Sequence, residues 1–179
     1  DYGVLDRSGL RAHEPHLSDR IVGGIHWRDP ASVSDPGAVT KAYAALFESR
    51  GGRIVAGDAR SLAESGDGWT VAAEGSAIVA RDAVVALGPW STDILAPLGY
   101  RIPLAVKRGY HMHYGTTGDA VLNRPVLDAD VGFVITPMAR GIRLTTGAEF
   151  ADRDAPPSTI QLDRCEPRAR ELFPLGERR

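Results

Sequence analysis

The hydrophobic positions of this chain follow two periods, which predicts a mixture of helices and strands. An apolar stripe at helical spacing runs through residues 36–50, between a proline and a pair of glycines. Short apolar runs bounded by turn residues predict strands at 53–56 and 83–87. Between these runs, hairpin-length spacing predicts an antiparallel meander over residues 59–80. The pattern is typical of a mixed α/β or α+β fold.

The second half of the chain predicts longer strands. Period-two alternation indicates one strand over residues 102–114. One face would carry Leu104, Val106, Arg108, Tyr110, Met112 and Tyr114, and the other Lys107, His111 and His113. Shorter patterns predict further strands at 21–28, 125–127, 131–136 and 142–146, a helix at 159–173, and a loop with one helical turn over residues 1–20.

Composition narrows the class of protein. The 179 residues are 43% hydrophobic without a long apolar run, which argues against a membrane-spanning chain. The net charge of −2 comes from interspersed residues of both signs, so we expect no nucleic-acid partner. A single cysteine, Cys165, excludes an intrachain disulfide and fits a reducing compartment such as the cytoplasm.

No self-contained catalytic motif is present. The sequence contains no GxSxG, HExxH, Walker loop or CxxC. Cys165 is interpreted as a surface or core residue. His111 and His113 share a strand face and are interpreted as polar sheet positions, because the spacing requires no third metal ligand. Chemistry performed by an organic cofactor would need no such catalytic set.

The stretch around Gly88 joins an apolar run to a turn. Residues 84–87 predict a strand buried on both faces, Pro89 ends it, and Ser91 or Thr92 is expected to cap a short helix. Gly88 permits a sharp bend or close approach of a flat ligand to the main chain. A buried tight turn without a ligand is the alternative interpretation.

Val84–Ser91 resembles the "VVxAxGxWS" segment of the FAD-dependent amine and amino-acid oxidoreductases. This superfamily includes D-amino-acid oxidase, glycine oxidase, sarcosine oxidase and D-amino-acid dehydrogenase. Further matches occur in the family's order at Asp35–Gly52, Asp58–Leu62, Pro103–Tyr110, Phe133–Phe150 and Leu172–Pro174. The sequence departs from the family pattern at Ala59, where valine is usual, at the additional Arg108, and at Thr145-Thr146 in place of glycines.

The resemblance implies roles for particular residues. Leu87, Gly88 and Trp90 would lie near the flavin, and Ala59 would lie near the adenine end of FAD. A substrate wall would include Tyr110, His111 and Val134. No catalytic residue is assigned, because hydride would pass from a small amino-acid substrate, expected to be a D-amino acid, to the flavin.

The resemblance also implies a domain organisation. Residues 1–100 would form a partial, Rossmann-like FAD-binding region interleaved with substrate-domain strands, and residues 101–179 a substrate-binding cap domain with an antiparallel or mixed sheet. The family's GxGxxG is absent from this sequence. We therefore expect an internal fragment that binds FAD poorly and is inactive alone. In the parent protein, we expect contact with an electron acceptor or peripheral contact with the inner membrane.

Two alternatives remain open at this point. One is a non-catalytic α+β module that binds or interacts through the same sheet. The other is a flavin enzyme of the same superfamily that acts on a secondary amine or on glycerol phosphate. An exposed apolar surface would favour the fragment, whereas a closed core would favour the module.

Overall fold

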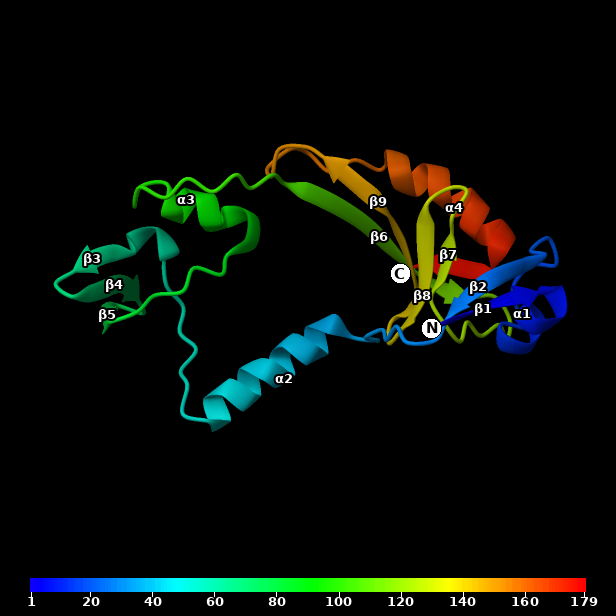
Figure 1. Ribbon diagram of the computed structural model, residues 1–179, viewed down its shortest axis with the longest axis horizontal. Coiled ribbons are helices and arrows are strands. Elements are labelled where there is room, and N and C mark those ends of the chain that lie inside the picture. Colours follow the sequence, from blue (N-terminus) through cyan, green and yellow to red (C-terminus); the bar gives the residue numbers. More distant parts are fainter. The chain divides into compact units, whose positions relative to one another are not determined.

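The computed structural model describes residues 1–179, which divide into two compact units. The first unit contains residues 1–37 and 107–179, and the second contains residues 38–106. Each unit has its own antiparallel sheet, of five strands in the first and three in the second (Figure 1). The expected mixture of helices with antiparallel strands is confirmed.

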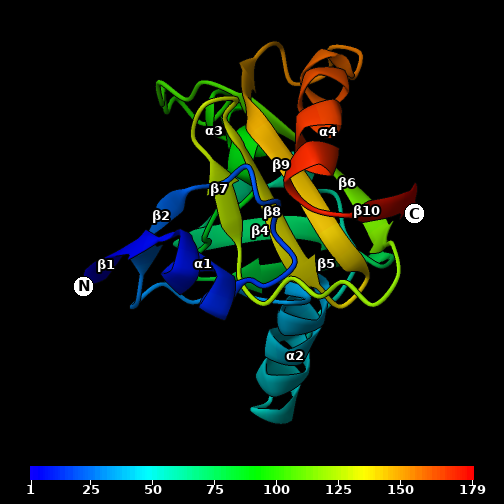
Figure 2. The same ribbon diagram turned by 90° about the vertical axis from the view of Figure 1, so that its right-hand side faces the viewer.

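The five-stranded sheet of the first unit has the strand order β10-β6-β9-β8-β7. The strands are β6 Lys107–Thr116, β7 Val126–Asp128, β8 Phe133–Met138, β9 Gly141–Phe150 and β10 Leu175–Arg178. One helix, α4 (Ile160–Leu172), lies across one face of this sheet (Figure 2). The predicted hairpins and terminal helix are confirmed, although β6 begins at Lys107 rather than at residue 102, and β10 was not predicted.

The hydrophobic core of the first unit lies between this sheet and α4. Its largest side chains with less than 2% exposure are Tyr114, Phe133, Phe173, Ile135 and Leu144. Tyr110 and Met112 pack against the same cluster, so the predicted alternation along β6 is confirmed. The opposite set of strand residues therefore faces away from α4.

A second, two-stranded sheet pairs β1 (Tyr2–Asp6) with β2 (Gly23–Trp27). Asp6 also begins α1 (Arg7–His13), where its carboxylate accepts a hydrogen bond of 2.8 Å from the Gly9 N–H. The predicted helical turn is confirmed, but the loop expected at residues 2–6 is wrong. The partner of β1 is distant in the sequence, so local pattern did not reveal the pairing.

The second unit contains most of α2 (Pro36–Ser49) and the meander of β3 (Ala63–Ser65), β4 (Gly68–Ala73) and β5 (Ser76–Ala80). Two 3-10 turns, Ala59–Ser61 and Gly88–Trp90, and the short helix α3 (Ser91–Leu95) complete it. The helix and the meander are confirmed. The first predicted strand of the meander begins instead as the 3-10 turn at Ala59.

Two predicted strands, at residues 53–56 and 83–87, are wrong. Neither segment pairs with a neighbouring strand, and Ile54 and Val84 are 56% and 91% exposed. A β-strand requires a neighbouring strand to pair with its successive backbone N–H and C=O groups, and neither run has one. Only single contacts occur, such as the hydrogen bonds between Ala56 and Glu74. The apolar stripe of α2 is also uncovered, with Val39, Tyr43, Leu46 and Phe47 exposed by 41% to 70%.

None of the helices has the length and apolar character needed to cross a membrane.

Candidate functional site

The Gly88 turn presents main chain to open space. Gly88 has φ of +54°, and a Cβ built on it would meet no atom within 4 Å. Two hydrogen bonds hold the turn. The Leu87 N–H donates to the buried Ser91 hydroxyl at 3.2 Å, and the Trp90 N–H donates to the Leu87 carbonyl at 3.2 Å. Ser91 is thus the first residue of α3 and supports the turn, and the expected side-chain cap of that helix is absent.

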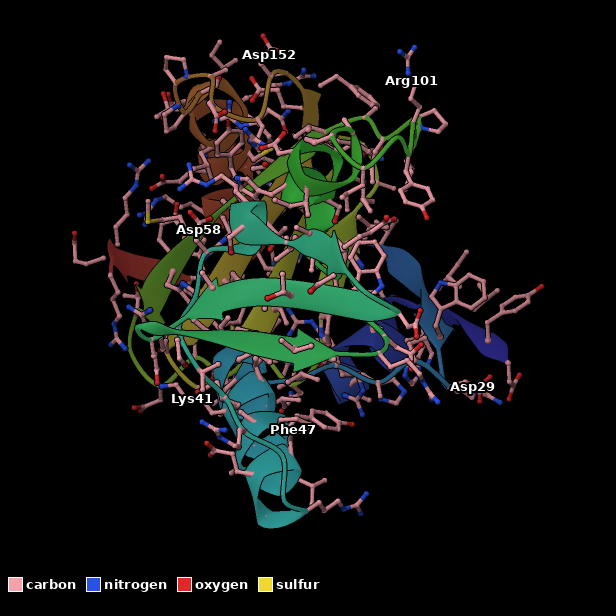
Figure 3. The ribbon with its side chains drawn as sticks, turned by 90° about the vertical axis from the view of Figure 1, so that its left-hand side faces the viewer. Asp29, Lys41, Phe47, Asp58, Arg101 and Asp152 are labelled. Carbon is pink, nitrogen blue, oxygen red and sulfur yellow. The ribbon has the colours of Figure 1, made fainter.

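Ala59 lies in the second exposed turn of the same unit. Asp58 begins this turn by accepting a hydrogen bond of 3.0 Å from the Arg60 N–H. The Ser61 hydroxyl accepts a bond of 2.8 Å from the Ala72 N–H, which fixes the turn to β4. Asp58 projects from this turn above the meander (Figure 3). The geometry holds the main chain of Ala59 in one position without burying it.

Helix α3 contacts both the Ala59 turn and the Gly88 turn, so the structure brings these two predicted cofactor contacts into one neighbourhood. Beside them is a hollow of about 360 Å³, whose lining side chains are all apolar or aromatic. Its lining includes the aromatic residues Trp69 and Tyr100 together with Val84 and Val85. The apolar run expected to be a buried strand therefore forms part of an open surface.

In the first unit, His111 and Val134 lie in one row across the sheet. The strand register pairs His111 with Thr145, and Thr145 with Val134. Tyr110 lies on the other face, where its hydroxyl donates to Glu149 at 2.6 Å and accepts from the Ser158 N–H at 3.1 Å. The three residues expected to form the substrate wall therefore lie on two faces, because neighbouring residues of a strand, such as Tyr110 and His111, face opposite sides of the sheet.

A second row on the same face contains His113, Arg143 and Thr136. The Nε atom of Arg143 is buried and has no hydrogen-bond partner, which is the one such buried side-chain atom in the chain. Arg143 also has no ion pair, because no carboxylate oxygen lies within 4.0 Å of its guanidinium group. We call the face of β6, β9 and β8 turned away from α4 the far face, and its polar strand residues are Lys107, His111, His113, Thr136, Arg143 and Thr145.

The far face carries two cationic strand residues, Lys107 and Arg143. The strand register places no aspartate or glutamate on it, since Glu149 and Asp128 point to the α4 side, where they contact Tyr110 and Arg168. Burial lowers the pKa of His113, and the nearby His111, Arg140 and Arg143 lower it further. The rings of His111 and His113 meet edge to face, with centroids 5.4 Å apart. No group of three metal-binding side chains forms around them.

Sequence reasoning missed Arg143. The residue occurs in the Ile142-Arg143-Leu144 segment that resembles the family, but the resemblance assigns it no site role. Alternation along the hairpin could have identified it, because the flanking Ile142 and Leu144 are both buried in the core. An arginine between two core positions must face the other side of the sheet.

A comparison with protein families matches residues 1–178 to the family described as "FAD dependent oxidoreductase". Among curated proteins, the chain is 28% identical over 173 residues to the D-amino-acid oxidase of Bradyrhizobium diazoefficiens, covering 95% of this chain and 40% of that protein. It is 33% identical over 186 residues to the D-amino acid dehydrogenase of Methylobacterium radiotolerans, covering 98% and 43%. The chain therefore spans less than half the length of these relatives.

Solved structures show the same fold. The glycine oxidase of Geobacillus kaustophilus superposes with a TM-score of 0.78 at 20% identity, covering 97% of this chain and 47% of that one. The L-proline dehydrogenase of P. horikoshii superposes with a TM-score of 0.76 at 16% identity, covering 99% and 51%. With the family match along nearly the whole sequence, these findings show that this chain belongs to the FAD-dependent oxidoreductases of the DAO family.

Proposed function

We propose that this chain is part of a longer flavoprotein, here called the parent flavoprotein, that oxidises a D-amino acid. The observation that carries the proposal is the match to a D-amino acid dehydrogenase along 98% of the chain at 33% identity. Oxidation of the amino acid Cα–H needs a hydride acceptor, and bound FAD would supply that chemistry.

The two exposed turns of the second unit fit a flavin nucleotide. Gly88 has space above its main chain and a positive φ, so a planar group could lie against it without a side chain intervening. Leu87 and Trp90 are 37% and 54% exposed beside it. These residues would hold the flavin end, and the main chain of Ala59 would hold the adenine end.

The first unit would supply the substrate side. His111 and Val134, with Thr145 between them, form a continuous strip on the far face that could orient an amino acid and exclude water from its Cα. Tyr110 lies on the other face of the sheet, so it would support this strip through its hydrogen bond to Glu149 rather than form part of it. The single cysteine suits work in a reducing compartment such as the cytoplasm.

The uncovered apolar surfaces favour this proposal over a self-sufficient binding module. A module should bury its apolar stripe, whereas Tyr43 on α2 is 70% exposed and Val84 is 91% exposed. The rest of the parent flavoprotein would cover these surfaces. We therefore expect the 179-residue chain to bind FAD poorly and to be inactive alone. Titration of the purified chain with FAD checks this expectation, and stoichiometric binding would contradict it.

Anaerobic mixing of the parent flavoprotein with candidate substrates tests the activity. We expect D-alanine to bleach the visible flavin absorbance, and L-alanine, L-proline and glycerol 3-phosphate to leave it unchanged. Bleaching by L-proline or glycerol 3-phosphate alone would assign the enzyme to a different substrate class. A flavin that no amino acid reduces would contradict the proposal.

A further inference from the structure

We propose that the exposed face of the two-stranded β1-β2 sheet binds a second copy of the parent flavoprotein. This inference goes beyond the proposed function and depends on it only for the existence of that longer protein. Four large apolar side chains, here called the ribbon face, are 58% to 78% exposed: Tyr2, Val4, Ile25 and Trp27. The strand register pairs the two aromatic residues with each other and the two aliphatic residues with each other, so all four project from one side.

The opposite side of the same sheet is already covered. Helix α1 contacts both strands there, and Leu5 and Leu10 are partly buried between them. A two-stranded sheet is marginally stable in water unless its faces pack against other elements. Burial of the ribbon face would therefore stabilise β1 and β2, because apolar surface would leave water.

The surrounding charges favour a protein partner over a lipid surface. Residues 1–7 and 23–29 carry three aspartates and two arginines, whereas an anionic membrane attracts an excess of basic residues. The charged groups lie at the ends of the strands, where Arg28 pairs with Asp1 at 2.8 Å and Asp6 accepts a hydrogen bond from Gly9. An uncharged centre with tyrosine and tryptophan inside a polar rim is typical of protein–protein interfaces.

The exposed area suits a second copy of the same surface. With roughly 150–250 Å² for each aromatic side chain, the four exposed fractions correspond to about 500 Å² in each copy. Two ribbon faces in contact would bury about 1,000 Å² in total, which is near the lower limit of a specific interface. We therefore expect a dimer that dissociates on dilution.

The ribbon face is also complementary to itself. A two-fold axis parallel to the strands would place Tyr2 of one copy on Trp27 of the other. The same axis would place Val4 on Ile25, so that aromatic residues meet aromatic residues and aliphatic residues meet aliphatic ones. The rings of Tyr2 and Trp27 already lie against each other within one copy, with centroids 5.5 Å apart. Such a contact closes after two copies.

The remaining part of the parent flavoprotein is expected to cover other surfaces. The exposed stripe of α2 and the unpaired run that includes Val84 belong to the second unit. The ribbon face belongs to the first unit, where the five-stranded sheet and α4 already enclose a core. We therefore assign the ribbon face to a second copy.

Sedimentation of the parent flavoprotein tests the assignment. We expect a dimer at micromolar concentration, and we expect Trp27→Glu to raise the dissociation constant by about tenfold or more, because like charges would meet at the centre of the contact. Ile160→Glu is the matched control, since Ile160 is 76% exposed on α4 of the same unit, and it should stay dimeric. An unsubstituted protein that is monomeric, or a dimer that Trp27→Glu leaves unchanged, would overturn the proposal.

Cross-linking with small side chains keeps the test independent of the folding of Trp27→Glu. We expect a mixture of Val4→Cys and Ile25→Cys copies, treated with oxidised glutathione, to form disulfide-linked dimers. Ile160→Cys and the unsubstituted protein should form none, because Ile160 lies outside the ribbon face and Cys165 is buried. Monomers alone in the oxidised mixture would contradict contact between two ribbon faces.

Cosedimentation with vesicles of phosphatidylglycerol and phosphatidylcholine tests the lipid alternative. We expect no binding that depends on Trp27. Monomers that bind the vesicles, and lose that binding with Trp27→Glu, would overturn the proposal in favour of a membrane surface. If the parent flavoprotein oxidised no amino acid but dimerised through the ribbon face, the proposed function would fail while this inference stood.

Discussion

The Tyr114 hydroxyl donates a hydrogen bond of 2.8 Å to the carboxylate of Glu166 across the interior of the first unit. Tyr114 lies on β6 and Glu166 on α4, so this bond joins the sheet to its helix. Arg170 and Arg178 donate to the same carboxylate at 2.9 Å each. Although burial opposes its ionisation, these three donors lower the pKa of Glu166. The network holds the sheet whose far face carries the proposed substrate contacts.

Removing the Tyr114 hydroxyl should destabilise the chain. We expect Tyr114→Phe to lower the free energy of unfolding by about 1 kcal/mol, because the two arginines still satisfy Glu166. Urea denaturation at neutral pH measures the change. Tyr43→Phe is the matched control, since Tyr43 is 70% exposed on α2, and it should be neutral. Equal effects of the two substitutions would show that the buried bond contributes nothing.

The raised pKa of Tyr114 predicts that the chain loses stability at alkaline pH. Burial, with the Glu166 carboxylate, raises the pKa of Tyr114 to about 12 from the ordinary value of 10.0. A group whose pKa is higher in the folded state than in the unfolded state stabilises the fold at pH values below its unfolded pKa. This contribution is lost as the pH rises through the folded pKa. The unfolding free energy of the native chain should therefore fall more steeply between pH 10 and about 12 than that of Tyr114→Phe. Parallel curves would contradict the assigned shift.

A substitution in the exposed apolar stripe of α2 should have different effects in the 179-residue chain and in the parent flavoprotein. Tyr43→Asp should leave the stability of the 179-residue chain within about 0.5 kcal/mol, because the side chain is largely in water. In the parent flavoprotein, the same substitution should lower the melting temperature and the flavin content. Lys41→Asp is the control, since Lys41 and Phe47 of the apolar stripe project from different sides of α2 (Figure 3). Equal effects in both contexts would mean that nothing covers the stripe.

Local sequence signals predicted the elements whose partners are close in the chain. The meander β3-β4-β5 and the hairpin β8-β9 pair neighbouring strands, so turn residues and alternation were sufficient. The pairing of β10 with β6 joins residues far apart in the sequence, and no local pattern indicated it. The chain also crosses between the two units twice, near residues 37 and 107, which composition does not mark.

The strands predicted at residues 53–56 and 83–87 are wrong for a different reason. Both segments are apolar as the sequence indicates, but a strand also needs a neighbouring strand to pair with, and no strand of this chain pairs with either segment. The site residues show the same limit. His111 and Val134 share a face as the alternation predicts, and alternation could also have placed Arg143 on that face, but only the register shows that it lies beside His113. Burial of its Nε atom could not be read from the sequence.

We propose that the Gly88 turn leaves its main chain open so that the flavin can approach it closely. Gly88→Val should strain the left-handed backbone by about 1–2 kcal/mol without a clash, since a Cβ there meets no atom within 4 Å. Gly118 is the matched control, because it has φ of +60°, equal open space and a place in the other unit. Gly118→Val should bear the same strain.

The most direct measurement is the visible flavin absorbance of the purified parent flavoprotein carrying each of these substitutions. We predict that Gly88→Val abolishes bound flavin, whereas Gly118→Val retains it at the level of the unsubstituted protein. Equal flavin content in the two variants would contradict the account, because the added side chain at Gly88 would then meet no ligand.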